Sequence, residues 1–157
     1  MVLNVSASLI AGLILFLLGF FKTFFINLFL NTFYKGVRIN GRWKAKQEKE
    51  TARGYPLTFP TDYTFEIKQF AGKISGVATA EFGHPERESV TYNINGTIKD
   101  NFVCLTLLLN ETNRISHCHF LLQIIDSAER MEGYMTFYAL KANEINAMEI
   151  EWKYVGK

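Results

Sequence analysis

A long apolar segment near the N-terminus constrains the fold of this chain more than any other feature. From Ser8 to Leu30 nearly every side chain is apolar, and the first 34 residues carry one charged side chain, Lys22. The hydrocarbon core of a bilayer is about 30 Å thick and needs roughly 20 apolar residues of helix. Ser8 to Leu30 supplies 23. We therefore expect a transmembrane segment over residues 1–35 and a separate domain over residues 36–157.

Two other interpretations of this segment fit the residues less well. A cleaved signal peptide has a basic N-terminal region and small residues at its cleavage site. Here no Lys or Arg precedes Lys22, and bulky residues occupy the zone of a cleavage site, namely Phe24, Phe25, Phe29 and Phe33. A hairpin of two spans needs about 40 apolar residues, more than Met1–Tyr34 holds. A single span is the better interpretation.

Charge around the span predicts its orientation. Only the terminal amine precedes it, whereas six basic residues follow it closely: Lys35, Arg38, Arg42, Lys44, Lys46 and Lys49. The positive-inside rule then places the C-terminal domain in the cytoplasm. The chain has two cysteines, Cys104 and Cys118, and a reducing compartment would leave them as free, mostly buried thiols.

Alternation of apolar and polar residues predicts β-strands in the C-terminal domain. Tyr63, Phe65 and Ile67, for example, are separated by Thr64 and Glu66, which is the pattern of a half-buried strand. Turn-forming residues divide the domain into eight such segments, near residues 38–47, 62–71, 73–82, 89–98, 102–109, 117–125, 131–140 and 145–155. Eight strands without helices between them bury their edges by pairing the first with the last. We therefore expect an all-β fold, an eight-stranded antiparallel up-and-down barrel of lipocalin-like type, preceded by an N-terminal transmembrane helix.

Two segments carry further expectations about this barrel. Gly41-Arg42-Trp43 is similar to the G-x-W of lipocalins, and we expect Trp43 to close one end of the barrel against a basic side chain. The strand Phe102–Leu109 is apolar on both faces. Because an exposed stripe of this kind promotes aggregation, we expect a second subunit or lipid to cover its outer face.

Sequence signatures of catalysis are missing from the chain. We find no Gly-rich phosphate loop, no nucleophile elbow and no suitably spaced pair of carboxylates, so we expect no enzymatic activity, no catalytic residue and no cofactor. His117-Cys118-His119 places two imidazoles on one strand face, but a zinc site needs three or four ligands, and we expect no metal. Residues 35–157 hold 16 basic and 15 acidic side chains, which argues against binding of polymeric nucleic acid.

Polar side chains on inward-facing registers are the candidate ligand residues, because a buried polar group without a partner is unfavourable. The alternation predicts that Gln69, Tyr92 and Thr106 point inward, Thr106 together with Cys104. One face of a later strand carries Tyr134, Thr136 and Tyr138. A hydrogen bond inside the barrel explains each of them alone, whereas together they outline a cavity suited to flat, polar nucleobases. Basic residues of the predicted loops would meet phosphates at the rim, namely Arg53, Arg114 and Lys141. The ligand-binding residues that we predict are Gln69, Tyr92, Thr106, Arg114, Tyr138 and Lys141.

The order of short motifs along the chain resembles a known family. After the membrane segment come Gly41-Arg42-Trp43, Ile67-Lys68-Gln69, Gly72, Ile74-Ser75-Gly76, Tyr92-Asn93-Ile94-Asn95-Gly96, Met131-Glu132-Gly133-Tyr134 and Ile150-Glu151-Trp152-Lys153. This arrangement resembles the membrane-anchored, β-strand-rich effectors of bacterial cyclic-oligonucleotide anti-phage systems, of the CBASS or the related Panoptes type. In CBASS, a cyclic dinucleotide made by a partner nucleotidyltransferase enters the barrel, the helices assemble and the inner membrane is breached. Panoptes effectors are instead held silent by a constitutively made cyclic dinucleotide.

The resemblance implies a function and a set of partners. It implies an anti-phage effector in the bacterial inner membrane that binds a cyclic dinucleotide, forms a homo-oligomer, is linked to a nucleotidyltransferase or cyclase, and causes cell death or growth arrest. The family usually has two transmembrane helices before the barrel, whereas this chain is expected to have one. The main alternative is a membrane-tethered, lipocalin-like carrier of a lipid or other apolar ligand. A third interpretation is a structural subunit with a solid barrel.

Overall fold

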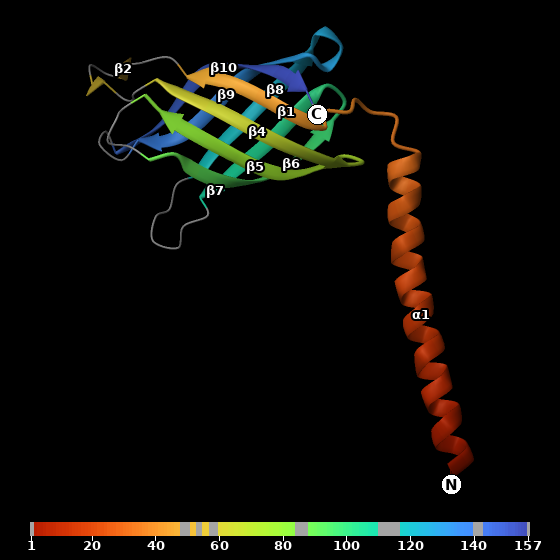
Figure 1. The fold of residues 1–157 in the computed structure, drawn as a ribbon. Coiled ribbons are helices and arrows are strands. Elements are labelled where there is room, and N and C mark those ends of the chain that lie inside the picture. The colour runs from red at the N-terminus through yellow and green to blue at the C-terminus, as the bar shows by residue number, and fades with distance from the viewer. Residues whose placement is uncertain are drawn as a thin grey trace. The chain divides into compact units, whose positions relative to one another are not determined.

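A computed structural model describes residues 2–47, 51–52, 55–56, 60–83, 88–109, 117–139 and 143–156 of the chain. Contacts within the chain divide it into two units, Met1–Lys35 and Gly36–Lys157. Figure 1 shows a single helix in the first unit and a barrel of strands in the second. Each unit is described by itself.

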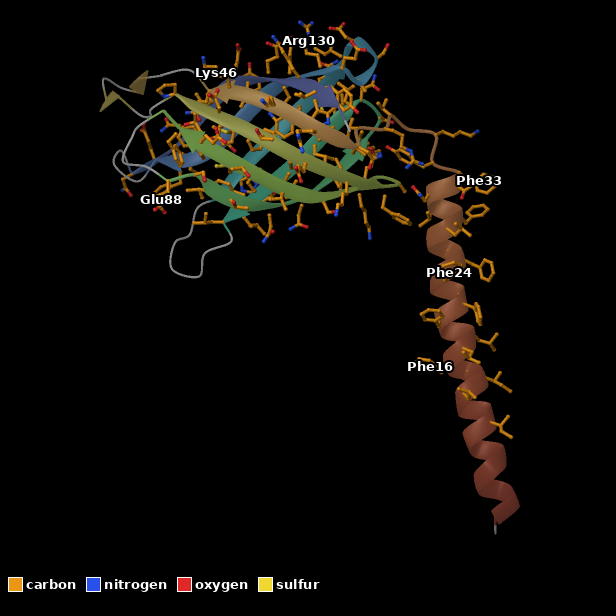
Figure 2. All side chains as sticks on the ribbon, viewed as in Figure 1. Phe16, Phe24, Phe33, Lys46, Glu88 and Arg130 are labelled. Atoms are coloured by element: carbon orange, nitrogen blue, oxygen red, sulfur yellow. The ribbon has the colours of Figure 1, made fainter. Side chains whose placement is uncertain are left out.

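The first unit is one helix, α1 (Val2–Thr32). Its stretch Ile10–Thr32 has 23 residues and a mean hydropathy of 2.2, so it is long and apolar enough to cross a membrane, a test that some signal sequences also pass. Side chains such as Phe16 and Phe24 project from the helix and are exposed (Figure 2). A helix that is apolar on every side has no polar face to turn toward water, which agrees with the predicted span.

The second unit is a closed barrel of eight antiparallel strands. Each strand pairs with the next one along the chain, and the last pairs with the first. The strands are β1 (Gly41–Gln47), β4 (Thr61–Phe70), β5 (Lys73–Phe82), β6 (Val90–Lys99), β7 (Phe102–Leu109), β8 (His117–Ile125), β9 (Arg130–Ala139) and β10 (Glu144–Gly156). This topology confirms the predicted fold class, and every strand begins and ends within three residues of its predicted position.

Two small elements were not predicted from the sequence. A pair of two-residue strands, β2 (Thr51–Ala52) and β3 (Tyr55–Pro56), forms a separate sheet. A short 3-10 turn, η1 (Asp126–Ala128), joins β8 to β9.

Glycines allow the strands to bend tightly enough to close the barrel. Gly76 on β5 has a φ of +156°, and a Cβ added there would lie 2.0 Å from the backbone oxygen of Glu66 on β4. A Cβ at Gly133 on β9 would lie equally close to the backbone oxygen of Leu121 on β8. Only glycine permits such an approach between neighbouring strands. At these positions the backbones therefore lie closer together than a side chain would allow.

The two ends of the barrel differ in what closes them. Residues 36–40, here called the strap, precede β1, and the end that holds them together with the β4–β5, β6–β7 and β8–β9 turns is the strap end. The opposite end is the far end. Figure 2 labels Arg130 near the strap end and Glu88 near the far end.

Large aromatic side chains fill the strap half of the interior. Trp43, Trp152 and Phe65 are fully buried. The ring centroids of Phe65 and Trp152 lie 3.6 Å apart in a stacked pair, and Phe120 meets the edge of that stack at 5.3 Å from Trp152. Trp43 donates its indole N–H to the backbone oxygen of Ile39 and packs against the ring of Tyr154. Trp43 therefore closes the strap end as a plug, with an aromatic neighbour in the contact that we observe.

Candidate ligand site at the far end of the barrel

The interior changes character toward the far end. Six polar or polarisable side chains on inward registers of different strands form what we call the far-end ring: Gln47, Thr61, Tyr63, Tyr92, Cys118 and Asn146. Strand pairing brings them together, since Cys118 and Asn146 both lie opposite Phe137, on β8 and β10. Alanines lie between them on the neighbouring strands, at Ala45, Ala78 and Ala80. The far half thus combines small and hydrogen-bonding residues with apolar ones such as Phe137 and Leu109.

Burial keeps the ionisable members of the ring neutral. Tyr63 donates its hydroxyl to Oε1 of Gln47 at 3.1 Å. Burial raises the pKa of Tyr63 far above its usual value, and the proximity of Cys118 and Tyr92 raises it further. Burial also raises the pKa of Cys118 to about 11. At physiological pH the ring therefore presents hydroxyl, amide and thiol groups without charge, beside the faces of two tyrosine rings.

Two buried N–H groups on β10 lack a hydrogen-bond acceptor among the described residues. They are Nδ2 of Asn146 and Nε1 of Trp152, both on the inward register that also carries Met148 and Ile150. An unsatisfied buried donor costs about 1–3 kcal/mol, and native proteins keep such groups few. Asn146 lies in the far-end ring, where a ligand with acceptor atoms would gain a hydrogen bond, whereas Trp152 lies six residues away among the packed rings of the strap half.

A third buried nitrogen has a different explanation. Nε of Arg130 also lacks a well-aligned hydrogen bond, but it lies 3.1 Å from a carboxylate oxygen of Asp126 and 3.3 Å from one of Glu132. The ion pairs compensate this charge at the outer surface, so Arg130 does not contribute to the ligand site.

Of the predicted ligand residues, Tyr92 lies in the far-end ring and Gln69 lies at the opposite end. The side chain of Gln69 is buried and points inward as expected, but the strap and the following turn occupy its amide group. Its Oε1 accepts from the backbone N–H of Ile39 at 2.8 Å, and its Nε2 donates to the backbone oxygens of Val37 and Ala71. Gln69 therefore fastens the strap to the barrel.

The predicted inward placement of Thr106 and Tyr138 is wrong. On β7 the inward residues are Val103, Leu105 and Leu107, so Cys104 and Thr106 face outward. Tyr138 is 50% exposed on the outer face and donates its hydroxyl to Asn143. Tyr134 shares that outer register with Thr136 and is also exposed.

The prediction failed because the packing of apolar residues, and not the polar ones, determines which register of β7 and β9 is buried. Both registers of β7 carry large apolar side chains, so alternation alone does not determine which set is buried. On β9 the thin, flexible side chains of Met131 and Met135 fill the space beside Trp152 and Phe120. The tyrosines on the other register keep their hydroxyl groups at the surface, where partners are available.

The remaining predicted residues lie outside the described part of the chain. Arg114 and Lys141 of the predicted site, together with Arg53, fall between the described strands. Their expected role at the rim stays a prediction.

Sequence reasoning missed Gln47, Thr61 and Asn146, although a signal for two of them was present. Gln47 continues the inward series of Trp43 and Ala45, and Asn146 precedes Met148 in the inward series of β10. A polar residue that follows buried apolar residues on the inward register, at the end of a strand, is typical of the open end of a barrel. Thr61 carried no such signal, because it lies one residue before the predicted strand.

The two predicted thiols lie on different faces of the wall. Cys118 is buried and Cys104 is exposed, and both are free. His119 faces outward, with its Nδ1 at 3.1 Å from Oγ1 of Thr106. Within the described ranges, the structure places no three His, Cys, Asp or Glu side chains where they would hold one metal ion.

The outer face of β7–β9 is partly hollow, and the described residues that line the hollow include no Asp, Glu, Lys or Arg. A groove of about 540 Å³ is lined there by Cys104, Thr106, His119, Leu121, Tyr134 and Thr136, among others. Phe102 and Leu121 are about half exposed on the same face. This is the face that the sequence predicts to be covered by another subunit or by lipid.

The chain matches no protein-family model, no curated protein and no solved structure.

Proposed function

We propose that this chain is a membrane-tethered sensor whose far-end ring binds a cyclic dinucleotide and thereby controls oligomerisation and disruption of the bacterial inner membrane in anti-phage defence. The observation that supports a ligand site is the N–H group of Asn146, which lies in the far-end ring without an acceptor among the described residues. The class of ligand follows from the chemistry of the ring and from the resemblance of the chain to membrane-anchored anti-phage effectors.

The far-end ring suits a nucleobase for two reasons. Tyr63 and Tyr92 offer aromatic faces, and Tyr63 already stacks at 5.8 Å on Phe65, so a planar base would extend an existing stack. Asn146 offers an N–H group without an acceptor among the described residues, beside the neutral side chains of Gln47 and Thr61. The phosphates would stay at the rim and away from the start of β10, because Glu144 occupies the register before Asn146.

In the proposed sensor, the apolar helix transmits the response to the membrane. By the positive-inside rule the barrel lies in the cytoplasm, where a second messenger is made. Contacts between barrels through the groove on the outer face of β7–β9 would bring the helices together, because association of one module raises the local concentration of the other.

The alternative function, carriage of a lipid or other apolar ligand, receives less support. A fatty acyl chain needs a continuous apolar space along the barrel, and the stacked Phe65, Trp152 and Phe120 occupy the middle of it. An apolar ligand would also offer no hydrogen-bond partner to the polar groups of the far-end ring.

Titration calorimetry of the full chain in detergent with a panel of cyclic di- and trinucleotides tests the proposal. We expect one member to bind, and Asn146→Ala and Tyr92→Phe each to weaken its affinity about tenfold, since one hydrogen bond contributes about 1 kcal/mol. The matched controls are Thr106→Val and Tyr138→Phe on the outer face, which should bind as the unchanged chain does.

Failure of the whole panel to bind would remove the sensor function. Copurified lipid in native mass spectra of the unchanged chain, together with that failure, would favour the carrier. A nucleotidyltransferase or cyclase encoded beside this chain would support the messenger class independently.

A further inference from the structure

Two neighbouring turns at the strap end are each flanked by a pair of one Phe and one Lys. The β4–β5 turn is flanked by the cross-strand pair Phe70 and Lys73, and the β6–β7 turn by the pair Lys99 and Phe102. In each pair both side chains point outward and are exposed, with Phe70 at 41% and Phe102 at 50%. An exposed Phe beside a Lys, twice at the same end of a barrel, is an amphipathic arrangement and calls for a partner with both apolar and anionic parts.

Both turns are tight and are joined to each other. Ala71 and Asp100 adopt left-handed backbone conformations, with φ of +49° and +55°, so each turn reverses the chain within two residues. The backbone N–H of Ile98 donates to the oxygen of Gly72 at 2.8 Å, which links the end of β6 to the β4–β5 turn. The two Phe–Lys pairs therefore belong to one rigid surface, which we call the Phe–Lys rim.

Charge around the Phe–Lys rim is positive on its own side. Lys68 and Arg38 add to Lys73 and Lys99, and Asp100 is the one acidic group in the two turns. The opposite side of the strap end is different, since Asp126, Glu129 and Arg130 around η1 carry a net negative charge. Basic side chains thus outnumber acidic ones on the part of the strap end that also exposes the phenylalanines.

We propose that the Phe–Lys rim docks the barrel onto the surface of an anionic lipid bilayer. Phenylalanine rings partition into the region between headgroups and acyl chains, and lysines beside them contact lipid phosphates through a flexible apolar stem. Chain connectivity favours lipid over a protein partner. The strap follows directly on the unit whose helix is long enough to cross a membrane, and Gln69 fixes the strap to this end of the barrel. The inference does not depend on the ligand of the far-end ring.

Tryptophan reporters in the full chain test this docking in proteoliposomes. Trp43 and Trp152 are fully buried, so a tryptophan at an exposed position adds a distinct, quenchable signal. In vesicles containing phosphatidylglycerol, we expect nitroxide-labelled lipid to quench Phe70→Trp and Phe102→Trp several-fold more than Ile145→Trp. Ile145 is the matched control, because it is 77% exposed on the outer face near the far end.

Three results would overturn the proposal. Equal quenching at residues 70, 102 and 145 would mean that the rim does not face lipid. Equal quenching of the rim reporters in purely phosphatidylcholine vesicles would remove the recognition of anionic lipid. A blue-shifted emission at residues 70 and 102 without quenching would assign the rim to a protein surface.

A charge reversal gives a second test that does not need new aromatic residues. The double variant Lys73→Glu with Lys99→Glu, placed in the Phe70→Trp background, should lose most of the quenching in phosphatidylglycerol vesicles. The double variant Lys44→Glu with Lys46→Glu makes the same change in net charge on the outer face of β1 and should keep it. Equal loss in both would attribute the effect to net charge and would overturn the role of the rim.

Discussion

The two halves of the barrel interior are built from different residues on the same eight strands. The strap half buries Trp43, Trp152 and Phe65 completely and closes its end with the hydrogen bonds of Gln69. The far half buries tyrosines, amides and a thiol, and it leaves the N–H group of Asn146 without an acceptor among the described residues. The packing of the strap half provides stability that allows an unsatisfied amide to persist in the far half, as is common at binding sites.

The largest expected effect is the loss of stability on removing Trp152. Trp152→Ala takes away a ring that stacks on Phe65 and meets Phe120, and such truncations cost about 3–5 kcal/mol. We expect urea unfolding of the detergent-solubilised chain, followed by circular dichroism, to show this loss. Cys118→Ala in the far half should lose much less. Comparable losses in the two variants would contradict the division of the interior into two halves.

Release of the strap is expected to have the next largest effect. Gln69→Ala leaves the N–H of Ile39 and the oxygens of Val37 and Ala71 without their partner, and each lost hydrogen bond is worth about 1 kcal/mol. We expect the free energy of unfolding to fall by about 2–3 kcal/mol. Gln69→Glu places a buried carboxylate against the oxygens of Val37 and Ala71, so at neutral pH it should destabilise the chain at least as much as Gln69→Ala. A fall below about 0.5 kcal/mol for the alanine variant would show that the strap is held by other contacts.

The barrel could be predicted from the sequence because its strands have one polar and one apolar register. On β4 the series Tyr63, Phe65, Ile67 and Gln69 is buried and the alternate residues are not, which is a period of two that needs no tertiary information. Closure followed from the number of strands and the absence of intervening helices. The short pair β2 and β3 was missed because a strand of two residues is too short to show an alternation of apolar and polar side chains.

The site was less predictable from the sequence, because it depends on which register of each strand is buried and on where each strand ends. On β7 two apolar registers compete, and packing against neighbours decides in favour of Val103 and Leu105. Gln69 has the inward register of a ligand residue, yet residues some 30 positions away in the chain occupy its amide. Alternation gives the direction of a side chain but not its distance along the barrel axis or its partners.

Alkaline pH should destabilise the far half through Cys118. Burial raises the pKa of this thiol from 9.0 to about 11 in the fold, so the folded chain binds more protons than the unfolded chain between these values. Stability is therefore fully present below pH 9 and falls as the pH rises toward 11, by roughly 2 kcal/mol at 1.36 kcal/mol per pKa unit. Tyr63 acts in the same direction, because its pKa is also raised.

Urea unfolding at a series of pH values measures this effect. Cys118→Ala should show a shallower fall of stability above pH 9 than the unchanged chain, and Cys104→Ala, at the exposed thiol on the outer face, should show the same fall as the unchanged chain. Identical pH profiles for all three chains would mean that Cys118 is not buried as a thiol.

The smallest effect on stability is expected at the residue with the largest proposed role in binding. Asn146→Ala removes an N–H group that has no acceptor among the described residues, and the gain from removing that donor opposes the packing lost with the side chain, so we expect the free energy of unfolding to change by less than about 0.5 kcal/mol. In the same preparation the affinity for the cyclic dinucleotide identified by calorimetry should fall about tenfold. A large loss of stability would instead assign Asn146 to the packing of the far half, and the difference between the two halves would then lie in residue size alone.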